Sequence, residues 1–417
     1  MAEKMNVLWL VNVLFPQVCR HIGNPSPVLG GWMYGYYSAI KTYCPNICLH
    51  ILSPYSGDDF LKVELDGTVF YAYPENTSVE ALSRWLKQVN EEVRPYAVHL
   101  HGSEFVHASA FVKTCGPAHV VLSIQGLMSV YARYYWGGID SKELGRYTTF
   151  RDVLKRDTIA SQQRAFAARG EKESWLISSV HNIAGRTDWD RENCWALNPE
   201  MNYFQCEEAL RTSFYEHSWN LSGCKRHSIF LSQVTYPIKG LHKFLEALPL
   251  IVRHYPDVEV YMVGDDLSKK PKYRRSTYWN YLSTFLERDE IGSRCHFLSR
   301  LSEQEMVQHY LSAHVFVCPS VIENSSNSVC EAQLLGTPVV AANVGGMANL
   351  ITSHKTGVLY RFEETSMLAH EVCRIFADDD YTQSLSTEER RVAQIRHDKK
   401  QIALSLEDIY KTIGGDE

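Results

Sequence analysis

The chain has 417 residues, more than one ordinary hydrophobic core needs and enough for two domains. Hydrophobic residues make up 45% of the sequence and charged residues 22%, which is the balance of a globular protein. The formal net charge of -6 argues weakly against a nucleic-acid-binding protein, since such proteins usually carry an excess of basic residues.

The cysteines and the N-terminal segment indicate in which cellular compartment the protein is expected. The 11 cysteines are scattered without a regular framework, as expected for reduced thiols in a cytosolic protein. The apolar run from Val7 to Phe15 is short and has no small-residue cleavage site, so it indicates a first buried strand rather than a signal peptide. No stretch is long and apolar enough to span a bilayer. We therefore expect a cytoplasmic protein whose membrane contact, if it makes any, is peripheral and on the inner face.

The first half of the chain begins with alternating strands and helices. The pattern predicts a helix at 32–43, a helical region with insertions at 131–169, and strands at 6–11, 47–52, 97–101, 120–124 and 175–180. The glycine-rich turn Gly30-Gly31 comes between the first strand and the first helix, where a phosphate could approach the backbone, although it lacks the G-x-G-x-x-G form.

The second half alternates more regularly. We predict strands at 228–232, 258–263, 295–298, 314–318 and 338–342, and helices at 240–253, 275–288, 303–312 and 326–336. Pro249 should kink or shorten the first of these helices. This alternation indicates a parallel, doubly wound sheet, in which ligands bind at the carboxyl ends of the strands. We place the domain boundary near 217–223 and expect a last helix at 401–413 to pack back on the first domain.

The polar segment after the strand at 314–318 is the strongest candidate site. Its cap-forming residues stand where the next helix must start, and an uncapped helix start suits a diphosphate. Glu323 precedes that helix and can accept hydrogen bonds from sugar hydroxyls, while Glu331 inside it can accept from a ribose diol. A polar loop followed by a capped helix explains the same residues, so both interpretations stand at this point.

Lys239-Gly240 occupies another strand-to-helix turn. A lysine here can neutralise a phosphate as a point charge, and the glycine lets the backbone come close. Taken alone, this lysine would be interpreted as an ordinary surface residue.

Together these residues resemble the large retaining glycosyltransferase family of GT-B architecture (glycosyltransferase family 4-like, "glycosyl transferases group 1"), which also contains sucrose synthases and bacterial mannosyltransferases. The resemblance is strong over about 228–360 and looser before that. The matching features are Lys239-Gly240, Glu323 and Glu331 with seven residues between them, the run Glu331-Ala332-x-x-x-Gly336-x-Pro338-Val339-Val340, and the glycine pairs Gly345-Gly346 and Gly30-Gly31.

The resemblance implies an α/β fold with two Rossmann-like, doubly wound domains facing across a cleft. Residues 1–218 would form the acceptor-binding domain, 219–398 the nucleotide-sugar-binding domain, and 399–417 the helix that packs back on the first. In the family the lysine contacts the donor diphosphate, the first glutamate the donor sugar and the second the ribose. The donor-binding residues that we expect are Gly31, Gln233, Lys239, Gly264, Arg300, Glu323, Asn324, Ser325, Ser326, Asn327, Ser328 and Glu331.

Two positions depart from the family pattern. Gln233 stands where an arginine is usual, so one cation facing the diphosphate is missing or is supplied elsewhere, by Arg300 or Arg186. Gln125 stands at the nearest equivalent of a first-domain histidine, with His101 as the alternative. We assign catalytic roles to Glu323, Lys239 and His101, and the first-domain assignment stays open.

Three other clusters carry weaker signals. Asp188-Trp189-Asp190 fits the Asp-x-Asp form that holds a divalent ion in other glycosyltransferases, but it lies far from the donor-binding half, so we expect no metal. We expect an acceptor-facing or ion-pair cluster instead, with Gln125, Arg186 and Asp188 as candidate acceptor-binding residues. The histidines at 99, 101 and 107 have poor spacing for metal ligands.

Basic residues form the last pattern. The stretch 151–169 interleaves basic and apolar residues, which suits an anionic membrane or a lipid-diphosphate acceptor, although a solvated helix face explains it as well. The basic run at 269–275 is interpreted as a basic loop.

The function that the resemblance implies is transfer of a hexose from a nucleoside-diphosphate sugar, UDP being favoured over GDP, to a carbohydrate or lipid-linked oligosaccharide acceptor. It implies retention of configuration, no required metal or cofactor, and a place in the synthesis of bacterial surface polysaccharide. Two alternatives remain: a nucleotide-sugar 2-epimerase on the same fold, and a catalytically inactive sugar-nucleotide-binding module.

Overall fold

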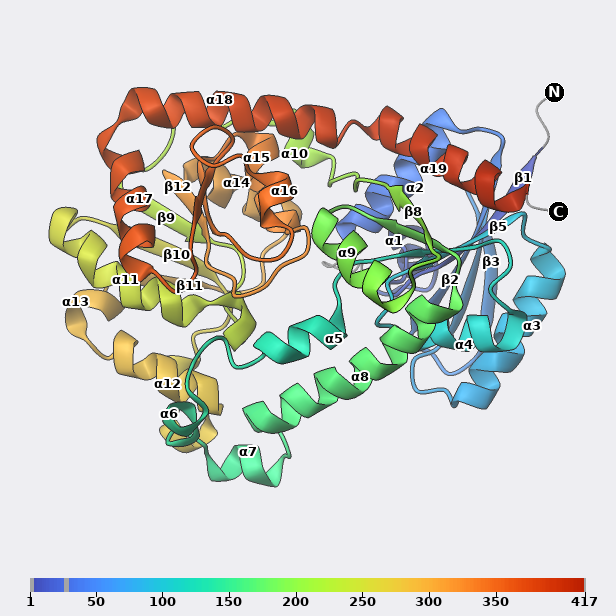
Figure 1. Cartoon of the computed structure of the whole chain (residues 1–417), viewed down its shortest axis with the longest axis horizontal. Helices are drawn as coiled ribbons and strands as arrows, with labels where there is room; N and C mark the ends of the chain where they lie inside the picture. The colour runs from blue at the N-terminus through green and yellow to red at the C-terminus, as the bar shows by residue number, and fades with distance from the viewer. Residues whose placement is uncertain (1–3, 26–29, 416–417) are drawn as a thin grey trace. The chain divides into compact units, whose positions relative to one another are not determined.

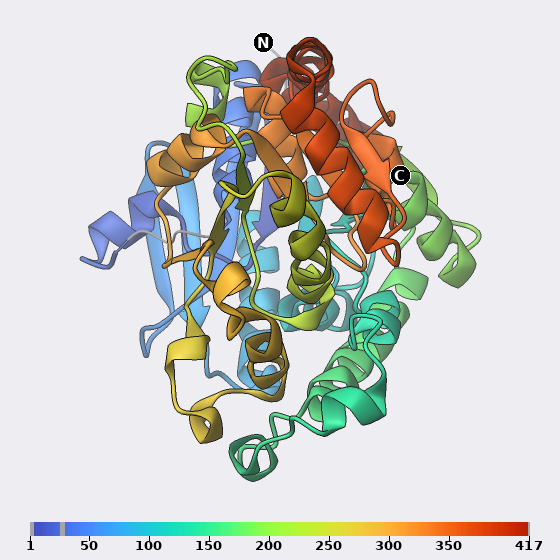
Figure 2. The ribbon, with the colours of Figure 1, turned by 90° about the vertical axis from the view of Figure 1, so that its left-hand side faces the viewer.

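The computed structural model describes residues 4–25 and 30–415, which form two compact units (Figure 1). The first unit contains the residues before 130, Arg169–Arg211 and the chain from His397 on; the second contains Val130–Ala168 and Thr212–Arg396. Each unit is built on a mainly parallel sheet with helices on its faces (Figures 1 and 2). The predicted fold class, two Rossmann-like domains of α/β type, is confirmed. Residues 130–168 lie in the sequence range given to the first domain, yet their contacts are with the second unit.

The first unit has an eight-stranded sheet in the order β3-β4-β2-β1-β5-β6-β7-β8. The paired strands run parallel except β3 and β4, which form an antiparallel pair at one edge. The chain order reverses between β1 and β5, which are neighbours in the sheet. The strands are β1 (Met5–Leu10), β2 (Ile47–Tyr55), β3 (Leu61–Leu65), β4 (Thr68–Pro74), β5 (Ala97–His101), β6 (Val120–Ser123), β7 (Asn182–Gly185) and β8 (Asn202–Gln205).

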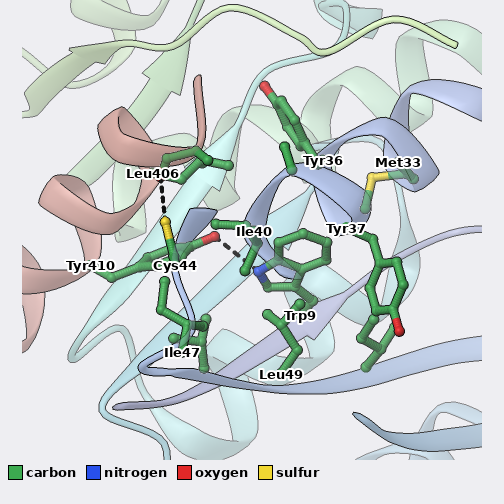
Figure 3. Packing of buried hydrophobic residues seen from close by; sticks show 14 of the residues in the cluster. Trp9, Met33, Tyr36, Tyr37, Ile40, Cys44, Ile47, Leu49, Leu406 and Tyr410 are labelled. Carbon is green, nitrogen blue, oxygen red and sulfur yellow. Dashed lines mark hydrogen bonds between the residues drawn. The ribbon is translucent and has the colours of Figure 1, made fainter. Parts of the chain in front are cut away.

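The core of the first unit joins the two ends of the chain. The C-terminal helix α19 (Lys399–Gly414) packs on α2 (Gly31–Tyr43), and Tyr410 reaches the sheet, where Trp9 donates its indole N–H to the tyrosine oxygen at 2.9 Å (Figure 3). Cys44 donates to the Ala403 carbonyl at 3.4 Å. These paired polar groups let large aromatic side chains be fully buried, because neither the indole nor the phenol is left without a partner.

The second unit has a six-stranded parallel sheet in the order β11-β10-β9-β12-β13-β14. The order reverses between β9 and β12, which lie side by side. Such a reversal opens a crevice at the carboxyl ends of the two strands, because their connections leave in opposite directions. The strands are β9 (Ser228–Leu231), β10 (Glu259–Val263), β11 (Cys295–Leu298), β12 (Val315–Cys318), β13 (Val339–Ala342) and β14 (Val358–Tyr360).

Helices connect the strands in both units. The longer ones besides α2 and α19 are α3 (Val79–Val93), α4 (Val106–Cys115), α8 (Ile159–Ser179), α9 (Asp188–Leu197), α11 (Leu241–His254), α12 (Thr277–Leu286), α14 (Glu303–Ser312), α15 (Asn327–Leu335), α17 (Thr365–Ala377) and α18 (Asp379–Arg396). The short ones are α1 (Pro16–His21), α5 (Met128–Tyr131), α6 (Ser141–Gly145), α7 (Phe150–Leu154), α10 (Ser213–Glu216), α13 (Asp289–Gly292) and α16 (Met347–Leu350), with single 3-10 turns η1 (Ala132–Tyr134), η2 (Pro237–Lys239), η3 (Leu267–Lys269) and η4 (Lys272–Arg274).

The strand predicted at 175–180 is wrong. Helix α8 continues to Ser179, and strand β7 begins at Asn182. The residues before this apolar run are rich in Ala, Gln, Glu, Lys and Arg, which are strong helix formers, and a short apolar run cannot be assigned to strand or helix from periodicity alone.

The predicted shortening of the helix at Pro249 is also wrong. Helix α11 runs through the proline to His254. Proline removes one hydrogen bond from a helix interior, but Leu248 and Ile251 are fully buried on either side of it, and this packing holds the helix together. The predicted polar helix at 275–288 is α12, whose aromatic and leucine side chains are mostly buried.

No helix in the described part of the chain is both long and apolar enough to cross a membrane. None of the 11 cysteines, all of which lie in the described part of the chain, forms a disulfide.

Candidate functional site

Two loops meet at the point where the second sheet reverses its order. One follows β9 and contains Lys239; the other follows β12 and contains Glu323. Because β9 and β12 are parallel neighbours, the two loops leave the same edge of the sheet side by side. They enclose a small pocket lined by Ser232, Gln233, Lys239, Phe316, Val317, Cys318, Pro319, Ser320, Glu323, Ser326 and Ser328.

An ion pair lies in this pocket. The ammonium of Lys239 donates to Oε1 of Glu323 at 2.6 Å, and the hydroxyl of Ser320 donates to the same oxygen at 2.8 Å. The side chains are only 18% and 10% exposed, so the pair is largely withdrawn from water. The structure therefore brings together two residues that lie 84 positions apart, as the resemblance implied.

The charge on Lys239 is stabilised by its surroundings. Burial alone lowers the pKa of this ammonium, but the Glu323 carboxylate and the nearby oxygens of Tyr236 and Tyr131 outweigh it, so the pKa lies well above the ordinary lysine value. Lys239 is consequently cationic at any physiological pH. A buried cation aimed into a pocket is a binding group for phosphate oxygens.

Two glycines hold the Glu323 loop against the rest of the unit. A Cβ on Gly240 would lie 1.8 Å from the Pro319 carbonyl oxygen, and a Cβ on Gly345 would lie 1.9 Å from that of Glu323. Both glycines have positive φ, 71° and 52°. The contacts are completed by hydrogen bonds from Val321 N to Ile238 O at 2.8 Å and from Gly346 N to Glu323 O at 3.1 Å. The glycines of the two motifs thus fix the backbone that carries the carboxylate.

Helix α15 starts directly behind this loop. Ser326 is its N-cap residue, but the serine side chain makes no capping hydrogen bond, and Gly336 ends the helix in the left-handed conformation, with φ 84°. The positive end of the helix dipole therefore points at the pocket without a side-chain acceptor from Ser326. The sequence left open whether this helix was capped, and the geometry favours the anion-binding interpretation.

Glu331 lies one turn into α15 and is buried. Tyr310 donates to the Ser328 carbonyl at 3.0 Å and approaches Oε2 of Glu331 at 3.5 Å. These contacts orient the carboxylate on the helix that starts at the pocket.

The other expected donor-binding residues surround the pocket less closely. Gln233 lines the pocket and is exposed, Gly264 follows β10 and donates its N–H to the Leu298 carbonyl at 2.7 Å, and Arg300 follows β11 and is exposed. Asn324 and Ser325 are buried in the loop itself, and Asn327 forms the first turn of α15. Gly31 belongs to the first unit, where it starts α2.

Sequence reasoning missed Tyr131. Its phenol oxygen accepts a hydrogen bond from the Asn324 backbone N–H at 3.1 Å, and burial raises the pKa of the phenol far above its ordinary value, so it remains neutral. Tyr131 comes from the segment 130–168, whose association with the second unit has no sequence motif. Ser320, which holds Glu323, was also missed.

His101 is completely buried in the first unit. Its ring stacks on His99 at a centroid distance of 3.7 Å, Trp9 packs edge-on at 4.8 Å, and neither ring nitrogen has a hydrogen-bond partner. Burial lowers the pKa of His101 well below its ordinary value, so the ring is neutral. A side chain with no exposed surface does not touch a substrate in this arrangement, which argues against the catalytic role that we expected for it.

Arg186 is buried and bonded within the first unit, where Gln125 is one of its partners. Arg186 is 5% exposed, its Nη1 lies 2.7 Å from the Glu208 carboxylate, and its Nη2 donates to the Gln125 backbone carbonyl at 3.3 Å. Because both sit in the first unit and the guanidinium is closed off by Glu208, Arg186 is not a ready substitute for the missing donor-site arginine.

The Asp-x-Asp motif starts a helix. Thr187 and Asp190 form a capping box at the N-terminus of α9, in which Asp190 accepts from the backbone N–H groups of Arg186 and Thr187 at 3.0 and 3.3 Å. Asp188 is exposed and pairs with Arg191 at 2.7 Å. The spacing of the two aspartates is thus explained by helix capping. Over residues 4–25 and 30–415, no three His, Cys, Asp or Glu side chains are grouped so that they could hold a metal ion.

Comparison with known proteins matches the part of the chain that contains Lys239, Glu323 and Glu331. Residues 225–378 match the family model described as "Glycosyl transferases group 1". The D-inositol 3-phosphate glycosyltransferase of Corynebacterium urealyticum is 26% identical over 182 residues, which are 42% of this chain and 41% of that protein. The match thus spans less than half of that relative's length.

Solved structures extend the likeness to both units. Sucrose-phosphate synthase from Thermosynechococcus elongatus superposes with a TM-score of 0.71 at 13% identity, covering 99% of this chain and 100% of that one. The Anabaena protein HepE in complex with UDP-glucose superposes with a TM-score of 0.65 at 16% identity, again covering 99% and 100%. At these identities the likeness concerns the fold. The whole chain therefore has the GT-B fold, and its residues 225–378 are similar to the group 1 glycosyltransferases.

Proposed function

We propose that the protein transfers a hexose from a UDP-sugar to a carbohydrate or lipid-linked oligosaccharide acceptor, with retention of configuration. The observation that carries the proposal is the Lys239–Glu323 pair, 2.6 Å apart, in a pocket at the start of α15. It places a permanent cation, a carboxylate and a helix N-terminus within one small site. A nucleoside-diphosphate sugar needs these three groups.

The pair suggests how the donor binds. In the absence of a donor Glu323 satisfies the Lys239 charge. When the diphosphate arrives, its oxygens take over the ammonium and the start of α15, and the released carboxylate accepts hydrogen bonds from the sugar hydroxyls. Glu331, on the same helix, accepts from the ribose diol. These are the roles that the family resemblance gives to the three residues.

The chemical step then depends on charge stabilisation. As the bond from the sugar's anomeric carbon to the diphosphate breaks, the acceptor hydroxyl oxygen bonds to that carbon and its proton passes to the leaving phosphate oxygen. Lys239 with the α15 dipole stabilises the negative charge that grows on the leaving diphosphate. We propose that this positive charge makes a metal unnecessary and that no protein nucleophile takes part. Activity that survives chelation with EDTA is the expected result.

For the acceptor and the pathway, we propose a glycan acceptor in bacterial surface polysaccharide synthesis. The support is the family match together with a neighbour solved with UDP-glucose. Substitution of Gln233 for the usual arginine leaves Lys239 as the main cation in the pocket, which makes the lysine more important here than in a site with two cations.

Two measurements test the proposal. A thermal-shift panel of UDP-, GDP- and ADP-sugars should show stabilisation by a UDP-sugar, since a ligand that binds only the folded state raises its melting temperature. Incubation of the stabilising donor with glycan acceptors should then release UDP and form a glycoside. Conversion of UDP-GlcNAc to a new nucleotide sugar without acceptor would instead identify an epimerase. Donor binding by calorimetry without turnover on any acceptor would identify a binding module.

A further inference from the structure

Helix α7 presents an unusual apolar surface in the second unit. Phe150 is 80% exposed, Leu154 73% and Val153 58%, and Tyr273, on the neighbouring turn η4, is 68% exposed. Among the described residues only two other large hydrophobic side chains are at least 58% exposed, Trp195 and Ile395, and both lie on other helices. Four of the six most exposed large hydrophobic side chains in the described residues therefore lie on α7 and η4. Concentrations of this kind mark interaction surfaces.

Basic side chains surround this apolar surface. The exposed ones in the two stretches 142–156 and 269–274 are Lys142, Arg146, Lys155, Arg156, Lys269, Lys270, Lys272 and Arg274, and the one exposed acidic residue there is Glu143. Ion pairs to Asp266 and Glu287 engage Lys269 and Lys272, which nonetheless remain 83% and 74% exposed. The surface is thus strongly positive on a chain whose net charge is -6.

The two stretches are fastened together by a buried carboxylate. Asp152 has no exposed surface, and its Oδ2 accepts from the backbone N–H and the hydroxyl of Thr277 at 2.6 and 2.7 Å. Thr149 donates to the Arg275 carbonyl at 3.4 Å. Figure 1 shows α6 next to the gold helix α12, at one end of the second unit, and α7 contacts the turn η4 that precedes α12. Helix α7 is therefore held with its apolar side chains outward, and their exposure is not that of a loose segment.

We propose that this surface, the basic tip (residues 142–156 and 269–274), binds an anionic lipid bilayer. Apolar side chains can enter the boundary between headgroups and acyl chains while the surrounding cations attract anionic headgroups. Neither group explains the surface by itself, because phosphate binding requires no exposed Phe and Leu, and an apolar protein contact requires no ring of lysines.

A second copy of the chain is a poorer occupant. Symmetric self-association would bring two basic surfaces together, and like charges that face each other oppose contact. A bilayer that contains anionic lipid offers the opposite charge over the whole width of the tip. From the sequence, the stretch 151–169 could be interpreted as a membrane-binding or a solvated helix face, and 269–275 as a plain basic loop. Asp152 holds the two stretches together in one surface, and this arrangement favours membrane binding.

Sedimentation with vesicles tests the proposal on the full chain. The wild type should bind vesicles of phosphatidylcholine with about 30% phosphatidylglycerol at least about tenfold more tightly than phosphatidylcholine alone, and high salt should weaken this binding. Phe150→Ser with Leu154→Ser should lower binding at least about tenfold, because the apolar anchor is lost. Lys155→Glu with Arg156→Glu should lower it by a similar factor. The matched control, Trp195→Ser with Ile395→Ser, removes equally exposed apolar groups elsewhere and should bind as the wild type does.

Four results would overturn the proposal. The first three are failure of the wild type to bind the anionic vesicles, equal loss of binding in the control variant, and sedimentation without vesicles that the Phe150→Ser/Leu154→Ser variant abolishes, since this last result would make the tip a self-association surface. Preferred binding of single-stranded RNA over vesicles at the tip would do the same. The melting temperature of each variant shows that it is folded, and no sugar donor enters the experiment, so the result does not depend on the proposed activity.

Discussion

The carboxyl edges of the two sheets differ in how they use their charged residues. In the second unit Lys239 and Glu323 line a pocket, where we propose that each exchanges its partner for a ligand. At the same edge of the first unit, Arg186 is closed against Glu208, and His101 lies under the rings of the core. Both edges have the topology that favours binding sites, so topology alone does not make a site. What distinguishes them is whether the charged pair lines a pocket.

The largest effect is expected from variants that remove the charged groups of the pocket. Lys239→Ala and Glu323→Ala should each lower sugar transfer by roughly 10²–10³-fold or more, because each removes a group aimed at the donor. Initial rates with a UDP-sugar measure the loss, and circular dichroism checks that the fold is kept. Lys243→Ala, which removes a paired lysine from the next turn of the same helix region, should keep wild-type activity. Near-wild-type turnover in either variant would contradict the assignment of Lys239 and Glu323 to the active site.

The donor motif could be predicted because its parts have separate local reasons. Lys239-Gly240 and Gly345-Gly346 are turns that need glycine, and Glu323 to Ser328 is a helix start, so each was visible in a few consecutive residues. The parallel alternation of strands and helices then placed them at one sheet edge. The fold class and the centre of the candidate site could be predicted from these short segments.

The rest depended on contacts between distant residues. Nothing near Tyr131 in the sequence predicts that its phenol accepts from Asn324, because the partner lies 193 residues away. Likewise, no local pattern shows that Glu208 neutralises Arg186 or that His101 lacks an exposed surface. Charged and titratable residues in the first unit were therefore assigned as ligands by their type, and the structure shows that the partners of several are in the protein itself.

The second prediction tests the closed pair in the first unit. Arg186→Met should lower the free energy of unfolding by about 3–5 kcal/mol, because it leaves the buried Glu208 carboxylate without its cation. The double variant with Glu208→Gln should recover part of this loss. Urea unfolding measures both, and the thermal shift caused by the UDP-sugar should be unchanged. If Arg186 instead contacts the acceptor, the variant would remain stable and show a raised KM for acceptor.

The third prediction concerns the glycine that shapes the donor pocket. Gly240→Ala should cost about 1–3 kcal/mol more than Gly23→Ala, since both positions have nearly the same positive φ but only the first would press a methyl group into a backbone carbonyl, that of Pro319. A Cβ on Gly23 would meet no atom within 4 Å, so this variant isolates the strain of the positive φ. Unfolding in urea gives the two values. Equal costs would mean that the Glu323 loop is free to move away.

The smallest expected effect separates a structural histidine from a catalytic one. Burial lowers the pKa of His99 to about 3, that of His107 to about 4 and that of His101 well below its ordinary value. The unfolded chain takes up these protons below about pH 6.5 while the folded chain does not, so the stability that the histidines contribute is present above pH 6.5 and is lost as the pH falls toward 4. His101→Phe, which keeps the stacked ring, should therefore reduce the loss of unfolding free energy between pH 7 and pH 5 by about 1–2 kcal/mol. His21→Phe, at an exposed position, should follow the wild-type curve.

Transfer at pH 7 should survive His101→Phe, because a ring without exposed surface cannot reach the donor or acceptor in this arrangement. Loss of turnover without loss of stability would instead show that the first unit rearranges to expose this histidine during the reaction.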